Sequence, residues 1–383
     1  MKSYKFDIAI IGGGPAGSTA ALKLAGFGFE VCLIEKKEFP RETVCGEFLS
    51  WEVIEEIKSL DLYDEFLKHN PNQIKNFKFY RYNSEISAGL DFPAYGLKRS
   101  TFDGFLLNAA RKKGAVVYQP FEIEDISGEN NAFKLIASNK SRENIEILSK
   151  HIIAAYGKQN FLDKKLNRKF AFTSSGISGI KFHIERNKLK NFNVEEIRIY
   201  SAPGIYCGLN AVNDDLITLC FLTKNKDENI PARDKIIKLV SQNENFKNLF
   251  EDNLGEYLSS IPIYGTGNIY FGRRSLVENG IIMIGDSAGV IAPLAGDGIG
   301  MAIQSAGLAA EILNKIMNGS YSSKEAEAEY DNRWNRLFKL RLRTAAAIQY
   351  LILSGVLKNA GVGVVKAFPQ LLPLFIKLTR NYL

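Results

Sequence analysis

The feature that most constrains this chain is a glycine pattern near its start, in residues 5–36. An apolar run suited to a buried strand comes first, and a helix rich in alanine and leucine follows the glycines. A second apolar run closes the segment. This order predicts the first unit of a parallel sheet, and the turn between strand and helix reads G-x-G-x-x-G at Gly12, Gly14 and Gly17.

Each position in this turn has a physical role. Gly12 permits a tight turn, Gly14 lets a pyrophosphate approach the backbone, and Gly17 lets helix and strand pack closely. Pro15 and Ala16 begin the helix, whose free N–H groups and partial positive charge attract phosphates. The pattern therefore predicts a dinucleotide site.

An acidic residue, Glu35, stands 23 positions after Gly12, at the end of the second strand. A carboxylate there accepts a hydrogen bond from a ribose 2′-hydroxyl and disfavours a 2′-phosphate. We expect Glu35 and the adjacent Lys36 to contact an adenosine dinucleotide that lacks this phosphate. The alternative is a glycine-rich turn that binds nothing, and the complete strand–helix–strand pattern argues against it.

With 383 residues and 46% apolar content, the chain can bury a large core and form two domains. The cysteines are scattered without zinc spacing and the histidines are isolated, so we expect no disulfide framework and no metal site. We interpret the histidines as structural or surface residues, and the cysteines in strand-like runs, Cys32 and Cys220, as core residues. The full set is Cys32, Cys45, Cys207, Cys220, His69, His151 and His183.

The N-terminal apolar run, Ile8 to Ile11, is too short for a signal peptide and leads directly into the glycine turn. The sequence has no run of about 18 apolar residues, so we expect no transmembrane helix. We expect a cytoplasmic protein.

The net charge of +7 is concentrated at the C-terminal end: residues 331–383 carry +8, and the rest about −1. Two stretches there, Thr344 to Leu357 and Val362 to Leu378, are apolar on nearly all sides. Apolar helices with basic edges suit an anionic membrane surface, so we expect peripheral association with the inner face of the membrane. A helical cap or a dimer interface is the alternative, and the absence of interleaved aromatic and basic residues argues against nucleic acid. The basic residues at the edges are Arg341, Arg343, Lys358, Lys366, Lys377 and Arg380.

The middle of the chain alternates between two kinds of pattern. Residues 74–97 and 176–222 alternate polar and apolar side chains, which predicts strands of a second, antiparallel sheet. A polar meander is expected at 121–149, followed by a separate buried strand at 151–155. Helices are expected at 50–59, 99–113 and 231–253.

A second glycine cluster follows a buried strand late in the chain. Gly285 and Asp286 end that strand, and an acid there can hold a polyol hydroxyl. A helix start rich in glycine offers free N–H groups to an anion, such as the negative charge near N1 of a reduced flavin. A tight turn with a capping Asp is the alternative. The helix start comprises Pro293, Gly296, Gly298, Ile299 and Gly300.

Together these motifs resemble FAD-dependent oxidoreductases of the aromatic hydroxylase, halogenase and geranylgeranyl reductase superfamily. The shared order is G-x-G-x-x-G, Glu35, FPR-x₃-CGE, Arg99 before a helix, and GD-x₃-G-x₃-P-x₂-G-x-G-I, over roughly residues 1–320. The resemblance implies an α/β fold: a discontinuous Rossmann-like FAD-binding domain, a mostly antiparallel substrate domain and a C-terminal helical region. The segments are 1–73, 98–157 and 271–320 for FAD, 74–97 and 158–270 for substrate, and 321–383 for the tail.

The resemblance also implies roles. Glu35 would bind the adenine ribose, Arg99 the flavin's linker region, and Asp286 the ribityl–pyrophosphate part, while Gly298 and Ile299 would lie against the isoalloxazine ring. The FPR-x₃-CGE loop, with Arg41, Cys45 and Gly46, is nearest to the geranylgeranyl reductase-like branch, where the cysteine lies close to flavin and substrate.

Several positions depart from the superfamily patterns. Tyr156-Gly157 replaces the Asp-Gly pair of hydroxylases, which is implicated in FAD and NAD(P)H binding. Of the prenyl reductase pattern Y-x-W-x-F-P, the chain keeps Tyr206 alone. The halogenase pattern W-x-W-x-I-P is missing, which argues against a halogenase.

We therefore expect a reductase that passes a hydride from FAD to a carbon–carbon double bond of a small apolar, isoprenoid- or lipid-like substrate. Its candidate catalytic residues are Cys45, Tyr206 and Cys207. Electrons would come from NAD(P)H or a protein donor by transient docking, because no second G-x-G-x-x-G is present. The alternatives are an FAD-dependent monooxygenase, which needs the same cradle, and a flavin-bound binding protein without turnover.

Overall fold

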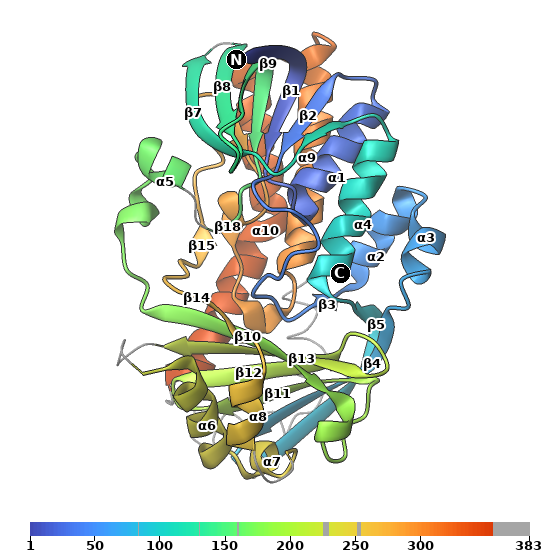
Figure 1. The fold of residues 1–383 in the computed structure, drawn as a ribbon, viewed down its shortest axis with the longest axis vertical. Helices are drawn as coiled ribbons and strands as arrows, with labels where there is room; N and C mark the ends of the chain where they lie inside the picture. Colours follow the sequence, from blue (N-terminus) through green and yellow to red (C-terminus); the bar gives the residue numbers. More distant parts are fainter. Residues whose placement is uncertain (83, 130, 159–160, 225–229, 251–253, 355–383) are drawn as a thin grey trace.

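The structure is a computed structural model that describes residues 1–354 apart from 83, 130, 159–160, 225–229 and 251–253. Two eight-stranded sheets organise it, one in the upper and one in the lower half of Figure 1. A long C-terminal helix runs alongside both. The predicted α/β architecture, with a parallel nucleotide-type sheet interrupted by a second, mostly antiparallel sheet, is confirmed.

The first sheet has a parallel core that is buried on both faces, as its apolar strands require. Ile10 pairs with Leu33 on one side and Ile153 on the other, and all three side chains are fully buried. The strand order is β16-β17-β9-β1-β2-β6. The strands are β1 (Lys2–Ile11), β2 (Val31–Ile34), β6 (Val116–Tyr118), β9 (Asn144–Ala154), β16 (Val277–Glu278) and β17 (Ile281–Met283).

Three helices lie side by side on one face of this sheet, α1 (Pro15–Gly26) between α4 (Arg99–Lys112) and α9 (Gly298–Met317). Small residues on α1, such as Ala20 and Ala21, are fully buried and let the helices approach closely.

The meander is made by β7 (Glu122–Glu129), β8 (Ala132–Ser138) and the first half of β9. The prediction of a separate buried strand at 151–155 was wrong, because β9 runs unbroken from Asn144 to Ala154 along the whole of β1. Its first half alternates exposed and buried side chains and its second half is buried throughout. A change of environment within one strand therefore imitated a strand boundary.

The second sheet has the order β14-β10-β13-β12-β11-β4-β5-β3, antiparallel except where β4 pairs with β11. Its strand β3 comes from within residues 1–73, which we had assigned to the nucleotide domain. Helices α6 (Ala232–Gln242), α7 (Glu244–Lys247) and α8 (Leu254–Ser260) cover the face that points away from the first sheet. The strands are β3 (Phe48–Leu49), β4 (Asn72–Arg81), β5 (Ser84–Gly96), β10 (Ile177–Glu185), β11 (Glu196–Ala202), β12 (Ile205–Ala211), β13 (Leu216–Lys224) and β14 (Tyr264–Thr266).

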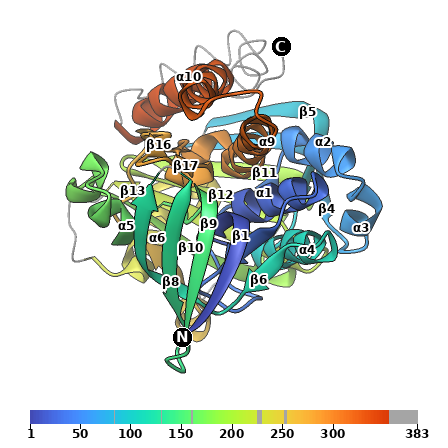
Figure 2. The ribbon, with the colours of Figure 1, turned by 90° about the horizontal axis from the view of Figure 1, so that it is seen from above.

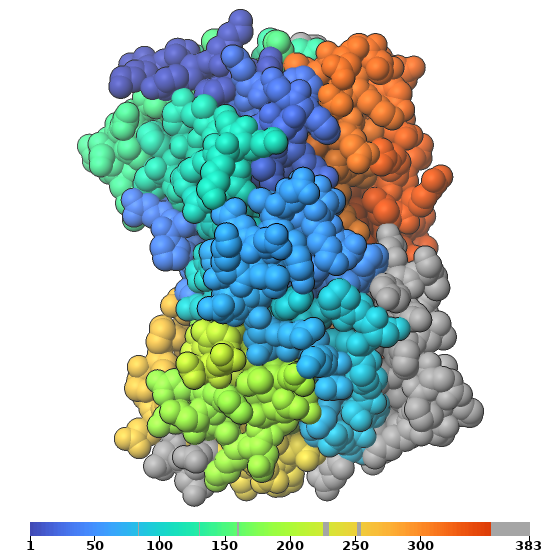
Figure 3. Space-filling model, turned by 90° about the vertical axis from the view of Figure 1, so that its right-hand side faces the viewer, coloured from blue at the N-terminus to red at the C-terminus, as the bar shows by residue number. Residues whose placement is uncertain are grey.

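Short elements join the two halves. Helices α2 (Trp51–Ser59) and α3 (Tyr63–Leu67), in mid-blue, lie between the upper and lower lobes of the space-filling view in Figure 3. The remaining elements are α5 (Phe161–Lys165), the β15 (Gly272–Arg273) and β18 (Gly289–Val290) ladder, and four 3₁₀ turns at Lys169–Phe172, Arg186–Lys188, Gly285–Ser287 and Pro293–Ala295.

The last described helix, α10 (Ser323–Ser354), packs beside α9, as Figure 2 shows from above. The predicted apolar stretch from Thr344 to Leu357 begins inside this helix, where Leu342, Ala345 and Leu353 are buried and Tyr350 is exposed. The stretch from Val362 to Leu378 lies outside the described residues. Within the described part of the chain, no helix is both long enough and apolar enough to cross a membrane.

Candidate active site

The predicted glycine turn joins β1 to α1 and has no room for a side chain at Gly12 or Gly17. Gly12 has a φ of +107°, and a Cβ there would lie 2.5 Å from the carbonyl oxygen of Ala155. A Cβ on Gly17 would overlap the carbonyl oxygen of Gly12. Gly14 instead faces open space, with the nearest group 3.6 Å from where its Cβ would be. The turn thus brings bare backbone and the start of α1 to a cavity, as a pyrophosphate requires.

Glu35 stands at the end of β2 with its carboxylate beside this turn. One oxygen accepts a hydrogen bond from the backbone N–H of Gly13 at 2.7 Å, and the other from that of Lys37 at 2.8 Å. These bonds fix the carboxylate in the cavity wall while each oxygen keeps a lone pair for a ribose hydroxyl. Lys36 lies at the cavity edge and pairs with Glu122.

Two arginines in the cavity wall are held by one buried carboxylate, that of Asp103 on α4. Arg99 makes two hydrogen bonds to it, at 2.7 and 2.9 Å, and Arg41 lies 3.4 Å from it. Burial alone would lower the pKa of Arg99, but the charge of Asp103 and its hydrogen bonds to Arg99 raise the pKa of Arg99 above its usual value. The Arg99 guanidinium therefore stays charged in the cavity wall, and the two arginines beside the glycine turn fit a pyrophosphate.

The second glycine cluster reaches the same cavity from the opposite side. Gly285 has a φ of +58°, and a Cβ there would lie 2.9 Å from that of Ala16 at the start of α1. This close approach places Asp286 in the cavity wall, where its backbone oxygen accepts a hydrogen bond from Arg274 at 2.9 Å. Gly296 is left-handed and turns the chain into α9.

The cavity has a volume of about 620 Å³ and its wall comes from both sheets. Most predicted site residues contribute to it, whereas Gly17, Gly285 and Gly300 lie behind the wall as packing positions. The predicted residues in the wall are Gly12, Gly14, Pro15, Ala16, Glu35, Lys36, Arg41, Cys45, Gly46, Arg99, Tyr206, Asp286, Pro293, Gly296, Gly298 and Ile299.

The three candidate catalytic residues have different surroundings. Cys45 lies in the cavity wall, and its sulfur accepts a hydrogen bond from the backbone N–H of Glu47 at 3.4 Å. Tyr206 also lies in the wall, but its hydroxyl donates to Gln349 on α10 at 3.3 Å, and burial raises the pKa of this phenol well above its usual value. The ring of Tyr206 therefore contributes to the cavity more than its hydroxyl does.

The prediction that Cys207 faces the cavity was wrong. Successive side chains on a strand point to opposite faces, so Cys207 on β12 points away from the face that Tyr206 occupies. It is fully buried in the core of the second sheet. The neighbouring strand β13 supplies Cys220 to the cavity wall instead, although we had interpreted Cys220 as a core residue.

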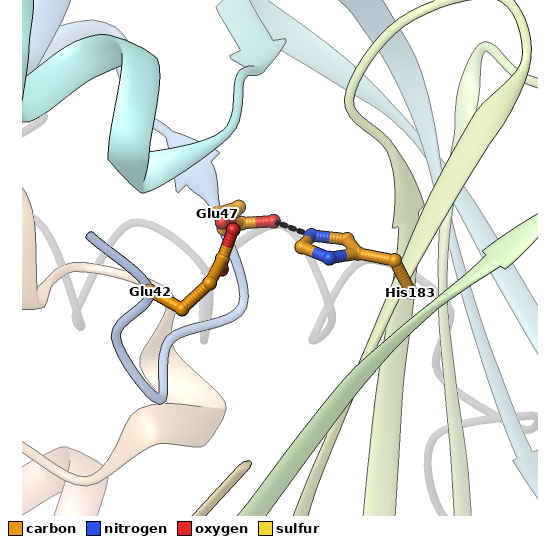
Figure 4. A group of neighbouring side chains, drawn as sticks. All are labelled: Glu42, Glu47 and His183. Carbon is orange, nitrogen blue, oxygen red and sulfur yellow. Dashed lines mark hydrogen bonds and ion pairs between the residues drawn. The ribbon is translucent and has the colours of Figure 1, made fainter. Parts of the chain in front are cut away.

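A buried charge cluster beside Cys45 was missed in the sequence. Glu47 is fully buried, and its carboxylate accepts hydrogen bonds from Lys181 Nζ and pairs with His183 Nε2, both at 2.6 Å. Figure 4 shows Glu47 pointing to His183, with Glu42 alongside. The C-G-E motif was the available sign, but its partners on β10 are distant in sequence. His183, expected to be structural or at the surface, thus belongs to the surroundings of the cavity.

Lys181 bears on whether this cluster could bind a metal ion. The potential ligand atoms of Glu42, Glu47 and His183 lie within 4.8 Å of one another, which is metal-like spacing. The ammonium of Lys181, however, lies 2.8 Å from Glu42 and 2.6 Å from Glu47, so it already supplies the positive charge between the carboxylates. The same charge, together with the hydrogen bond from His183, lowers the pKa of Glu47 despite its burial.

The fold and cavity place bare glycine backbone, an acid at the end of the second strand and a glycine-rich helix start around one space, which is typical of proteins that bind a dinucleotide. The sequence profile of the FAD binding domain family matches residues 5–336. The chain belongs to this family and is an FAD-dependent oxidoreductase.

Relatives of the chain carry several activities. It is 25% identical over 373 residues to a pyrrole-2-carbonyl carrier-protein chlorinase of Pseudomonas fluorescens, covering 84% of this chain and 79% of that one. It is 25% identical over 375 residues to a digeranylgeranylglycerophospholipid reductase of Methanosphaera stadtmanae, covering 94% and 89%. The fold is similar to p-nitrophenol 4-monooxygenase of Pseudomonas putida, with a TM-score of 0.77, 14% identity and full coverage of both chains.

Proposed function

We propose that the protein is a reductase that saturates a carbon–carbon double bond in an apolar, isoprenoid- or lipid-like substrate. Bound FAD, once reduced, supplies a hydride to one carbon of the double bond. The other carbon needs a proton. The observation that carries the proposal is Cys45, a thiol in the cavity wall whose sulfur receives the N–H of Glu47.

Cys45 is the candidate donor because its thiol carries a transferable proton and lies in the cavity wall. The hydroxyl of Tyr206 is committed to Gln349, and Cys207 lies outside the cavity. Part of the wall is apolar, as an isoprenoid chain would require: Tyr206 and Leu222 of the second sheet belong to one buried apolar cluster with Ile269 and Val290.

The electrons are proposed to come from NAD(P)H or a protein donor that docks transiently. Tyr156 stands where hydroxylases carry an acid, and its hydroxyl donates to Asp163 at 2.7 Å and accepts from Arg168 at 3.0 Å. These bonds hold the cavity wall together. Because position 156 carries a tyrosine, it supplies no carboxylate to bind a nicotinamide nucleotide, which favours a donor that docks transiently.

A membrane surface is the proposed source of the substrate. One side of α10 exposes basic and apolar residues together, at the spacing of three, four and seven that defines a helix face. Leu340 and Tyr350 are 59% and 65% exposed. The basic residues on this side are Arg336, Lys339 and Arg343.

The test uses the purified yellow holoprotein, reduced with dithionite under anaerobic conditions and mixed with geranylgeraniol in detergent micelles. Reoxidation of the flavin with saturation of the alcohol, read by mass spectrometry, supports the reductase. Reoxidation only after air is admitted, with an oxygen atom incorporated into the added substrate, would instead assign a monooxygenase activity. A flavin that neither reaction oxidises would assign a binding protein without turnover.

A further inference from the structure

Helix α10 lies behind three separate parts of the cavity wall. The hydroxyl of Tyr330 donates to the backbone oxygen of Met283 at 2.7 Å, just before Gly285 and Asp286. A Cβ on Gly289 would lie 3.1 Å from the ring of Trp334. Further along, Gln349 accepts the hydrogen bond of Tyr206. The helix therefore supports the cavity wall on both the first-sheet and the second-sheet side.

Between these contacts, Arg341 points inward and is 2% exposed. Its Nη1 donates to Gln304 on α9 at 2.8 Å. Its Nη2 contacts the carboxylate of Asp297 and lies 3.4 Å from that of Glu52. We had expected Arg341 among the basic residues at a membrane surface; this prediction was wrong, because its guanidinium is buried against carboxylates.

Asp297 connects this arginine to the cavity. It directly precedes α9, is fully buried and belongs to the cavity wall. The next turn of the helix makes room for it, since a Cβ on Gly300 would collide with the Asp297 carboxylate. The carboxylate is thus held at the helix end where Gly298 and Ile299 also face the cavity.

The charges at this helix end oppose one another. The N-terminus of α9 carries a partial positive charge that favours an anion, and a reduced flavin is more negative than an oxidised one. The carboxylate of Asp297 works against this preference, and the guanidinium of Arg341, which also lies beside the buried carboxylate of Glu52, compensates it in part.

We propose that Arg341 is a positioning residue that acts through Asp297 to stabilise the reduced flavin relative to the oxidised flavin. The proposal rests on the FAD site and not on the substrate. Arg341 lies on the part of α10 that follows residues 5–336, the range that the family profile matches.

The test measures the midpoint potential of the bound flavin by reductive titration against a reference dye, with no substrate present. Arg341→Met should weaken the relative binding of reduced flavin roughly tenfold, which lowers the potential by about 30 mV for two electrons. Arg341→Lys, which keeps the charge, should recover part of this shift. Arg343→Met, two positions along and exposed, should leave the potential unchanged.

Asp297→Asn provides the opposite change, because it removes the opposing charge and should raise the potential. The double variant should return toward wild type, as coupled neighbours do. An unchanged potential in Arg341→Met, or a lowered one in Asp297→Asn, would overturn the proposal. If Arg341→Met does not fold, Asp297→Asn decides alone. Because these measurements use no substrate, they stand even if the protein proves not to be a reductase.

Discussion

Glu47 and His183 are 136 positions apart in the chain, yet Oε2 of the glutamate lies 2.6 Å from Nε2 of the histidine. The other oxygen of the same carboxylate accepts hydrogen bonds from Lys181 and from the backbone N–H of Arg99. Glu47 therefore fastens the loop that carries Cys45 to strand β10 of the second sheet, so the thiol in the cavity is placed by charges from both halves of the molecule.

The first prediction concerns the pH dependence of this fastening. Burial raises the pKa of Glu47, but His183 and Lys181 together lower it by more, so the pKa lies below its usual value of 4.5. Such a carboxyl stabilises the fold at pH values above its pKa in the unfolded chain. This contribution to stability is lost as the pH falls through its pKa in the folded protein. Glu47→Gln should cost about 3 kcal/mol at neutral pH, and the difference from wild type should shrink below pH 4.5.

Urea unfolding at a series of pH values measures both effects. Glu42→Gln is the matched control, because its carboxylate contacts the same lysine but is 20% exposed. It should cost less than about 1 kcal/mol. Equal losses in the two variants, or a difference that persists in acid, would contradict this account of Glu47.

The second prediction concerns the glycine turn. A Cβ on Gly17 overlaps the carbonyl oxygen of Gly12, so Gly17→Ala must open the turn. Overpacking of this kind costs about 1–3 kcal/mol, which should weaken FAD binding roughly tenfold or more. Titration of the apoprotein with FAD, followed by flavin fluorescence, gives the affinity.

Gly104→Ala is its control, since Gly104 also lies within a helix and a Cβ there meets nothing within 4 Å. It should stabilise the fold by about 0.4–1 kcal/mol and leave FAD binding unchanged. If Gly17→Ala bound FAD as tightly as Gly104→Ala, the pyrophosphate would not lie over this turn.

The third prediction separates Cys45 from Cys207, the candidate on β12 that lies outside the cavity. Cys45→Ala should slow the saturation of geranylgeraniol by about 100-fold or more, as loss of a general acid does. Its flavin spectrum and its reduction by dithionite should stay as in wild type. Cys207→Ala should keep the rate, because Cys207 lies in the core of the second sheet. Equal rates for wild type and Cys45→Ala would assign the proton to another group.

The nucleotide side of the site could be predicted because its determinants are local. Gly12, Gly14, Gly17 and Glu35 all lie within one strand–helix–strand unit, and the sheet register follows from their apolar neighbours. The second glycine cluster follows a strand in the same way, and the structure brings it to the same cavity.

The substrate side could not be predicted in the same way, because its contacts join distant segments. Nothing near Glu47 indicates that Lys181 and His183 will face it, since this depends on how β10 sits against the loop. One error was avoidable. Tyr206 and Cys207 are neighbours on a strand, so alternation alone shows that they cannot both face one cavity.

The last prediction concerns the exposed side of α10. Arg336, Lys339 and Arg343 flank Leu340 and Tyr350 there, and each basic residue near an anionic surface contributes about 1 kcal/mol of attraction. Replacing all three by alanine should weaken binding to phosphatidylserine vesicles roughly 100-fold, measured by sedimentation of the full chain. Arg333→Ala is the control on the same helix, because Arg333 is already paired with Glu311 at 2.8 Å.

Binding of the wild type should also fall as salt is raised, since exposed charges are screened within about 10 Å at 0.1 M ionic strength. Two outcomes would show that this face binds no membrane: a wild-type protein that stays in the supernatant, or a triple variant that sediments with the vesicles as the wild type does. The apolar substrate would then have to reach the cavity from solution or from a carrier.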